Sequence, residues 1–209
     1  MRRYLAIGAA ATLLAIPPLA LGRATTTTTV TVGPPSLRTT FAPNTVTQAV
    51  GASIHWYWWA DSNAGPHNVR QDDKLFYSGA ATDNNPAGYT ITPSAGRFHY
   101  YCEPHRTRGM QGTLYIRPAV FSRTATSFGV RWSPGTNETG NRFDVRYRVD
   151  GGAWTKWGNN VAFSAAIFGS NNRPVPVTAG HTYEVQARSE TSTDLQKRSG
   201  WSPSARVTT

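Results

Sequence analysis

Two short segments of the chain contain the residues that could do chemistry. The segment GPHNV carries His67, and the segment CEPHRTRGM carries Cys102, His105 and Met110. A thiolate, two imidazoles and a thioether form a soft nitrogen and sulfur set, which suits copper in both of its oxidation states. Zinc gains little from a neutral thioether, and hard cations prefer oxygen ligands. We therefore interpret the four residues as a copper site in which the thioether makes a long, weak axial contact.

The elements that must position these segments are short strands. Runs rich in aromatic and β-branched residues are separated by clusters of Gly, Pro, Asn and Asp, and no segment has a sustained helical period. The β-prone runs are residues 46–50, 54–59, 89–92, 98–102 and 113–116. This pattern predicts an antiparallel β-sandwich, with the Cys102 loop at the end of an aromatic-rich strand.

The two motifs resemble the type 1 copper signature of the plastocyanin/cupredoxin family. The matching residues are PHNV around His67 and C-x2-H-x4-M from Cys102 to Met110, and the resemblance covers most of residues 41–118. It implies one type 1 copper ion with His67, Cys102 and His105 as trigonal ligands and Met110 as the axial ligand. It also implies electron exchange through the edge of His105.

The resemblance also assigns roles to residues around the ligands. Asn68 would tie the two ligand loops together by hydrogen bonds, and with Pro104 it would support the ligands from behind. Arg106 and Arg108 are a feature of this chain's own loop rather than of the family, and they are either solvated side chains or a cationic rim that steers an acidic redox partner. Together with Pro66 and Gly109 they make up the expected docking rim.

The site points to electron transfer rather than to an enzyme. The sequence contains no Ser/His/Asp set, no carboxylate pair at a recognisable spacing and no second metal motif. Two other functions remain open. In the first, the chain is a cell-surface binding or adhesion protein whose copper is structural or stored. In the second, which the missing catalytic cluster disfavours, it is a copper oxidase or reductase.

The second half of the chain, residues 119–209, begins a new set of strands. Residues 143–149 alternate strictly between apolar and polar side chains, and a hairpin turn follows at 150–152. The order of Trp132, Tyr147 and the segment GWSPS at 200–204 resembles a fibronectin type III domain, which has an immunoglobulin-like fold. That fold does not by itself supply a function.

Two groups of residues in this half could bind a partner. Four arginines fall on outward positions and form either a solvated face or a basic stripe for an acidic wall polymer or protein. Three tryptophans could stack on carbohydrate, or they could belong to the core. The arginines are Arg131, Arg146, Arg148 and Arg188, and the tryptophans are Trp154, Trp157 and Trp201.

The N-terminus carries the features of an export signal. Arg2 and Arg3 precede an almost wholly apolar run over residues 5–21, which predicts a signal peptide over residues 1–23. An uncleaved membrane anchor is the alternative. Residues 24–40 form a Thr-rich linker or a first strand, and in the second case the copper domain begins near residue 27. The protein is therefore expected in an extracellular, periplasmic or cell-surface location.

Composition limits the remaining possibilities. The net charge is +10, yet no run of Lys or Arg exceeds two residues, so no nucleic-acid partner is expected. A single cysteine excludes a disulfide within the chain and any multi-cysteine metal cluster. The predicted fold is all-β, with a cupredoxin-like Greek-key sandwich over 41–118 and a fibronectin type III-like sandwich over 119–209.

Overall fold

The computed structural model describes residues 26–59, 65–135, 139–169, 175–192 and 194–209. Over these residues the regular structure is β-strand apart from the short 3-10 helix η2 (Arg106–Arg108), which confirms the all-β fold. None of the helical structure in this part of the chain is long and apolar enough to cross a membrane. The expected signal peptide, residues 1–23, lies outside the described residues.

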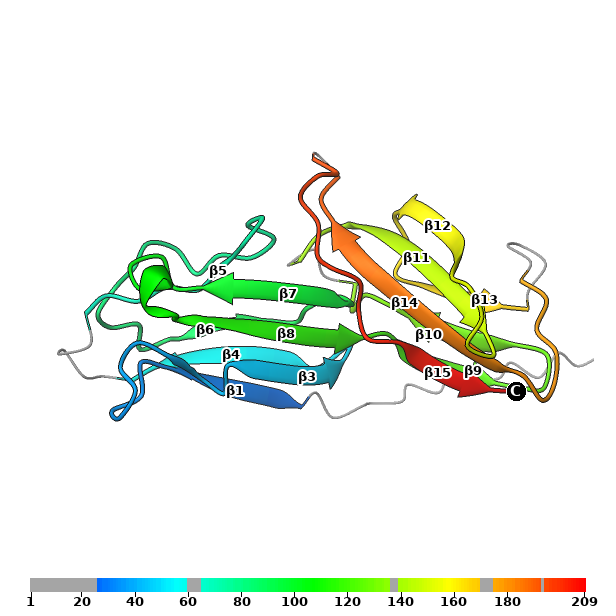
Figure 1. Cartoon of the computed structure of the whole chain (residues 1–209), viewed down its shortest axis with the longest axis horizontal. Helices are drawn as coiled ribbons and strands as arrows, with labels where there is room; N and C mark the ends of the chain where they lie inside the picture. Colours follow the sequence, from blue (N-terminus) through cyan, green and yellow to red (C-terminus); the bar gives the residue numbers. More distant parts are fainter. Residues whose placement is uncertain (1–25, 60–64, 136–138, 170–174, 193) are drawn as a thin grey trace, which may run out of the picture.

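The first sandwich consists of two four-stranded sheets (Figure 1). One sheet contains, in spatial order, β2 (Phe41–Ala42), β1 (Thr27–Val32), β4 (Ser53–Trp58) and β6 (Tyr89–Ile91). The other contains β3 (Thr45–Ala49), β8 (Gln111–Arg117), β7 (Gly96–Tyr101) and β5 (Arg70–Gln71). The Thr-rich segment thus forms a strand of the first sandwich along Thr27–Val32.

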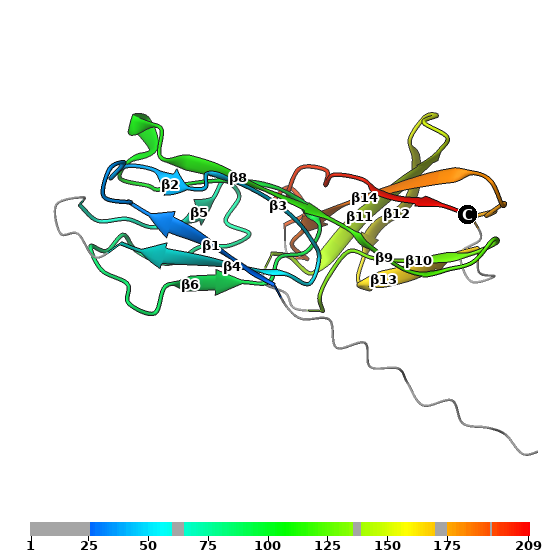
Figure 2. The ribbon, with the colours of Figure 1, turned by 90° about the horizontal axis from the view of Figure 1, so that it is seen from below.

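The expectation of a purely antiparallel sandwich is wrong in two places. β1 runs parallel to β4, and β3 runs parallel to β8. Figure 2 shows the arrows of β1 and β4 pointing the same way. After β2 the chain crosses to the other sheet as β3 and returns as β4, and such a crossover is what parallel neighbours require. Alternation of apolar residues does not reveal this direction, because it is the same in both arrangements.

An aromatic core fixes the strand that leads to the copper loop. Trp56 of β4 packs edge-on against Tyr100 of β7 with ring centroids 5.4 Å apart, and Phe41 lies 4.9 Å from Tyr100. Phe98, also on β7, is fully buried. Burying each such ring contributes about 2–3 kcal/mol, so β7 is anchored immediately before Cys102.

The second sandwich pairs a three-stranded with a four-stranded sheet. The first contains β13 (Ala165–Phe168), β10 (Phe128–Arg131) and β9 (Ala119–Arg123). The second contains β12 (Thr155–Val161), β11 (Arg142–Val149), β14 (Thr182–Glu190) and β15 (Ala205–Thr208). Trp157 of β12 packs against the buried Trp132 at 5.6 Å, so this tryptophan belongs to the core.

The two sandwiches are joined end to end (Figure 1). β8 continues into β9 through Pro118, and backbone hydrogen bonds add a second connection. Arg97 and Gly200 exchange two of them, at 3.0 and 2.9 Å, and the Ala95 N–H donates to the Trp132 carbonyl at 2.7 Å. Ser189 also donates its hydroxyl to the Ala95 carbonyl. β7 runs away from this junction, so the loop that follows it lies at the far end of the molecule.

Candidate metal centre

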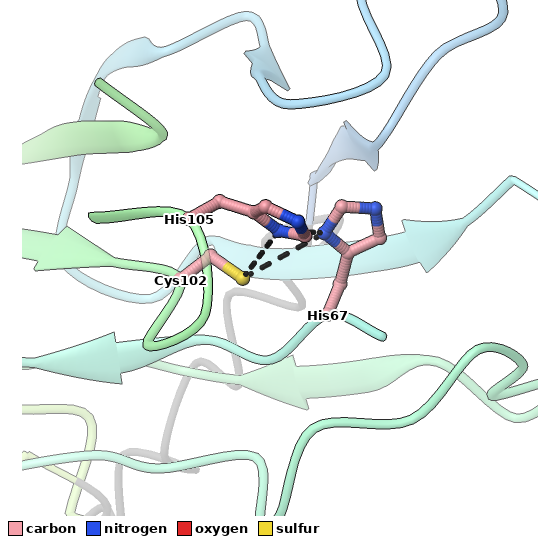
Figure 3. Close-up of side chains that lie close together, drawn as sticks. All are labelled: His67, Cys102 and His105. Atoms are coloured by element: carbon pink, nitrogen blue, oxygen red, sulfur yellow. Dashed lines mark hydrogen bonds between the residues drawn. The ribbon is translucent and has the colours of Figure 1, made fainter. Parts of the chain in front are cut away.

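Three donor atoms from two separate loops meet at the far end of the first sandwich (Figure 3). The Cys102 Sγ lies 3.6 Å from His67 Nδ1 and 3.5 Å from His105 Nδ1, and the two Nδ1 atoms are 3.2 Å apart. Cys102 is fully buried, and the exposed fractions of His67 and His105 are 3% and 6%. The sequence predicted these three residues as one site, and the fold brings them together.

Backbone hydrogen bonds shape the loop that carries Cys102, His105 and Met110. The His105 N–H donates to the Cys102 carbonyl, and the Met110 N–H donates to the His105 carbonyl, both at 3.2 Å. The Cys102 N–H donates in turn to the Met110 carbonyl at 3.0 Å. Gly109 ends η2 with a φ of 81°, a left-handed conformation that glycine adopts without strain. The loop therefore closes on itself and holds the fully buried Met110 beside Cys102.

The backbone of His67 is fixed from two sides. Its N–H and carbonyl pair with Thr82 at 2.9 and 3.0 Å, and the Trp58 indole N–H donates to the same carbonyl at 3.3 Å. On the other side of its ring, a Cβ placed on Gly33 would lie only 2.8 Å from His67 Nε2. Gly33 has a φ of +63°, so both its backbone and its position require glycine. The sequence analysis did not identify this glycine.

Asn68 connects the two ligand loops. Its Oδ1 accepts a hydrogen bond from the Glu103 N–H at 2.8 Å, and its Nδ2 donates to the Gly79 carbonyl at 3.1 Å and to the Glu103 carboxylate. Asn68 is fully buried, as is Cys102, next to Glu103 in the chain. The positions of His67 and Cys102 are therefore coupled through a single side chain.

Glu103 is the centre of a polar cluster that the sequence analysis missed. Its carboxylate accepts hydrogen bonds from Arg70, from Tyr77 at 3.0 Å and from Asn68. These hydrogen bonds hold the pKa of Glu103 below its usual range despite the opposing effect of partial burial. Its place beside Cys102 was visible in the sequence, but Arg70 approaches from β5 and Tyr77 from the loop that follows β5, and neither carried a local signal.

The electrostatic environment keeps the donors uncharged in the absence of a cation. Burial lowers the pKa of His67 from 6.5 to about 4, with a further contribution from His105. Burial, followed by the positive charge of Arg108, also lowers the pKa of His105. Burial raises the pKa of the Cys102 thiol, although backbone hydrogen bonds from Asn68 and His105 act in the opposite direction. At neutral pH the imidazoles are thus uncharged, so metal binding releases no net proton from them.

The donor set fits a transition metal ion. A metal bonded to nitrogen at about 2.0 Å and to sulfur at about 2.3 Å keeps such donors roughly 3.3–3.7 Å apart. The two sulfur–nitrogen separations, 3.5 and 3.6 Å, lie within this range, and the nitrogen–nitrogen separation of 3.2 Å lies just below it. Two buried imidazole nitrogens facing one thiol form the soft set expected for copper.

The remaining predicted residues lie at the surface around this centre. Pro66, Pro104, Arg106, Arg108 and Gly109 are all exposed. The Arg106 guanidinium stacks on Tyr101 at 4.1 Å from the ring centroid. The other two histidines of the first sandwich, His55 and His99, hydrogen-bond to Thr90 and Asp72 respectively and do not join the donor cluster.

Comparisons with known proteins agree with this geometry. Residues 28–117 match the family of copper-binding proteins described as the plastocyanin/azurin family. The chain is 33% identical over 100 residues to plastocyanin of Scenedesmus fuscus, covering 43% of this chain and 98% of the relative. The chain belongs to the plastocyanin/azurin family. Copper is accordingly the cofactor of this plastocyanin/azurin-family protein.

Other relatives and solved structures each match less than half of the chain. Chloroplastic plastocyanin of Chlamydomonas reinhardtii is also 33% identical over 100 residues, which is 43% of this chain and 66% of the relative. A mutant fern plastocyanin of known structure is 20% identical with a TM-score of 0.37, covering 43% of this chain and 99% of its own. A fibronectin type III domain of human collagen XX is 14% identical with a TM-score of 0.32, covering 44% and 90%. The family of the second sandwich therefore remains a prediction from sequence.

Proposed function

We propose that this protein is an exported carrier of single electrons, with one type 1 copper ion held by His67, Cys102, His105 and Met110. The observation that carries the proposal is the buried triangle of two imidazole nitrogens and one thiol in a domain of a copper-binding family. When bound there, copper supplies one-electron chemistry between its cuprous and cupric states.

The protein's own residues hold the donors in place and exclude water. The loop hydrogen bonds of Cys102 and Met110 and the Asn68 bridge fix the ligand residues through contacts within the protein. A donor cluster held in this way would change little between two oxidation states, which favours rapid electron exchange. Burial of all four proposed ligands leaves no open position for a substrate, and this supports a carrier rather than an enzyme.

The exposed residues above His105 form the proposed docking rim, which comprises Pro66, Arg106, Arg108 and Gly109. Its two arginines give it a positive charge, so an acidic redox partner would be attracted to this end of the molecule. His105 is the most exposed of the four proposed ligands, at 6%, and its ring would provide the route between the copper and the surface. The second sandwich leaves this end uncovered, since it is attached at the opposite end (Figure 1).

The second sandwich serves, in this proposal, as a spacer or interaction module. Its backbone hydrogen bonds to the first sandwich at Ala95 and Arg97 support a fixed arrangement of the two. Export is supported by the basic and apolar character of residues 2–21.

Redox cycling of the copper-loaded protein tests the proposal. We expect an intense visible absorption from thiolate-to-copper charge transfer, full reversibility over repeated oxidation and reduction, and fast exchange with hexacyanoferrate. Cys102→Ser should abolish the absorption while both sandwiches stay folded. Slow exchange would instead indicate a structural or storage role for copper in a binding protein. Turnover of nitrite or dioxygen by the isolated chain would identify an oxidase or reductase.

A further inference from the structure

The outer face of the second sandwich carries a continuous stack of guanidinium groups and indole rings. Arg146 of β11 lies over two rings, at 4.5 Å from the Trp154 centroid and 4.2 Å from that of Trp201. Arg148 covers Trp154 from its side and Arg188 covers Trp201, each at 4.7 Å. The predicted basic stripe is thus an ordered stack, and its tryptophan faces are already occupied by arginine.

The charges along this stack are unevenly compensated. At one end Arg188 donates two hydrogen bonds to Asp144, and at the other end Arg148 donates to Glu184 at 2.8 Å. The partners lie directly opposite each other on the paired strands β11 and β14. Each outer arginine therefore has a carboxylate of its own.

Among the described residues, the central arginine hydrogen-bonds to an amide and to no carboxylate. Arg146 donates from Nε at 2.9 Å and from Nη2 at 2.6 Å to the Gln186 Oε1, which carries no charge. Burial, together with repulsion from Arg188 and Arg148, lowers the pKa of Arg146. A guanidinium has five N–H donors, so three remain for a ligand after the contact with Gln186. An anion at this position would satisfy these donors and offset the repulsion.

A groove of about 280 Å³ opens beside this uncompensated charge. Asp144, the one carboxylate in its lining, is engaged by Arg188, whereas the exposed Lys156 makes no ion pair with any described residue. The other lining residues that offer polar or aromatic groups are Arg146, Trp154, Asn159, Arg188 and Trp201. The groove therefore presents two more positive charges than negative ones.

We propose that this groove binds a carboxylate group of an acidic polysaccharide. The free N–H groups of Arg146 and the ammonium of Lys156 supply the charge, and Asn159 can donate to and accept from sugar hydroxyls. A neutral sugar would need an open aromatic face, and arginine covers both indoles. An acidic peptide that docks by strand addition would pair with an edge strand, whereas Arg146 and Arg188 stand on the interior strands β11 and β14.

This site is independent of the proposed copper chemistry. β11 and β12 belong to the second sandwich, and the loop after β7 lies at the other end of the molecule (Figure 1). A polymer bound in the groove would leave the docking rim accessible. The inference goes beyond electron transfer, and its test does not depend on whether the copper site carries electrons.

Binding of a galacturonate hexamer to the whole protein, followed by calorimetry and tryptophan fluorescence, tests the inference. We expect saturable binding that weakens with salt and leaves the copper absorption unchanged. Gln186→Glu gives Arg146 an internal carboxylate and should weaken binding about tenfold or more without loss of thermal stability. Gln196→Glu makes the same charge change on an exposed loop and should have less than about a twofold effect.

Further measurements separate the remaining outcomes. Lys156→Gln, at an exposed position that should not affect folding, is expected to weaken binding about threefold. Equal binding of a neutral maltohexaose, or unchanged affinity in Gln186→Glu, would overturn the proposal. Stronger binding of poly-glutamate than of the hexamer would assign the groove to an acidic protein instead.

Discussion

The Asn68 Oδ1 accepts the backbone N–H of Glu103 at 2.8 Å, and this contact joins the loop of His67 to the loop of Cys102. The two ligand loops are separated by more than thirty residues of chain, and in the fold they share this buried side chain. The precision of the donor cluster therefore depends on a residue that touches no metal. Such outer contacts commonly orient metal ligands.

Replacing Asn68 by Ala should loosen the site. The Glu103 N–H and the Gly79 carbonyl would lose their partner, and each unsatisfied buried group costs about 1–3 kcal/mol. We expect a loss of about 2 kcal/mol in the free energy of unfolding and faster release of bound metal. Urea unfolding and metal transfer to a chelator measure these effects. Asn84→Ala, at an exposed position, is the control and should behave as wild type.

Gly33→Ala should disturb His67 specifically. The new Cβ would lie 2.8 Å from His67 Nε2 and 3.0 Å from the Arg38 carbonyl, and a φ of +63° is strained for alanine. Gly51→Ala introduces comparable strain at a φ of +97°, but no atom lies within 4 Å of its Cβ. We expect only Gly33→Ala to alter the visible spectrum of the copper protein. Identical spectra in both variants would show that Gly33 does not constrain the imidazole.

The copper-free protein should lose stability in mild acid. The unfolded chain binds a proton at His67 below about pH 6.5, whereas the folded chain does so only below about pH 4. Stability therefore falls as the pH decreases through this window, by about 3 kcal/mol at most. Urea unfolding at several pH values measures the slope. His67→Gln should flatten it, and a slope unchanged by this substitution would contradict the assignment.

Metal binding should release one proton at neutral pH. Burial raises the pKa of the Cys102 thiol, so the thiol is protonated until a cation binds its sulfur. The imidazoles of His67 and His105 contribute no protons, because their pKa values are lowered. Calorimetry with Zn²⁺, which is redox-inert, in buffers of different ionisation enthalpy counts the protons. Release of two or more would mean that at least one imidazole is protonated before binding.

Arg108 should contribute more than Arg106 to attracting an anionic redox reagent. Arg106 stacks on Tyr101, whereas Arg108 is exposed and its charge acts on His105. We expect Arg108→Gln to slow reduction by hexacyanoferrate(II) severalfold at low ionic strength and to have little effect at high salt. Arg123→Gln removes the same charge from an exposed position in the second sandwich and serves as the control. Equal slowing in Arg123→Gln would show that the effect comes from the net charge of the protein and not from the position of Arg108.

The sequence predicted the donor cluster because its chemistry is local. Cys102, His105 and Met110 lie within one short loop, and His67 follows a turn that also contains Pro66. The strict alternation along residues 143–149 likewise predicted the core side of β11, on which Phe143 and Val145 are buried. The grouping of Cys102, His105 and Met110 depends on neighbours in the chain, whereas the inclusion of His67 rested on the resemblance of a second motif to the copper family.

The features that could not be predicted depend on contacts between distant segments. The parallel pairing of β1 with β4 follows from a crossover that alternation does not encode. The Glu103 cluster needs Arg70 from a different strand, and Gly33 reaches His67 only through the fold. The stack around Arg146 required knowledge of which face Trp201 covers. In each case the residue types and their spacing gave no signal, because the contacts form only between segments that the fold brings together.

The exchange of hydrogen bonds between Arg97 and Gly200 has a mechanical consequence. Gly200 directly precedes Trp201, which lines the groove, and Arg97 lies near the start of β7. The hydrogen bonds between Arg97 and Gly200 therefore connect the groove to the strand that leads to Cys102. A polymer bound in the groove of the second sandwich would therefore stay at a fixed distance from the copper site. This distance would change only if a whole domain were added or removed, because β8 leads directly into β9 through Pro118.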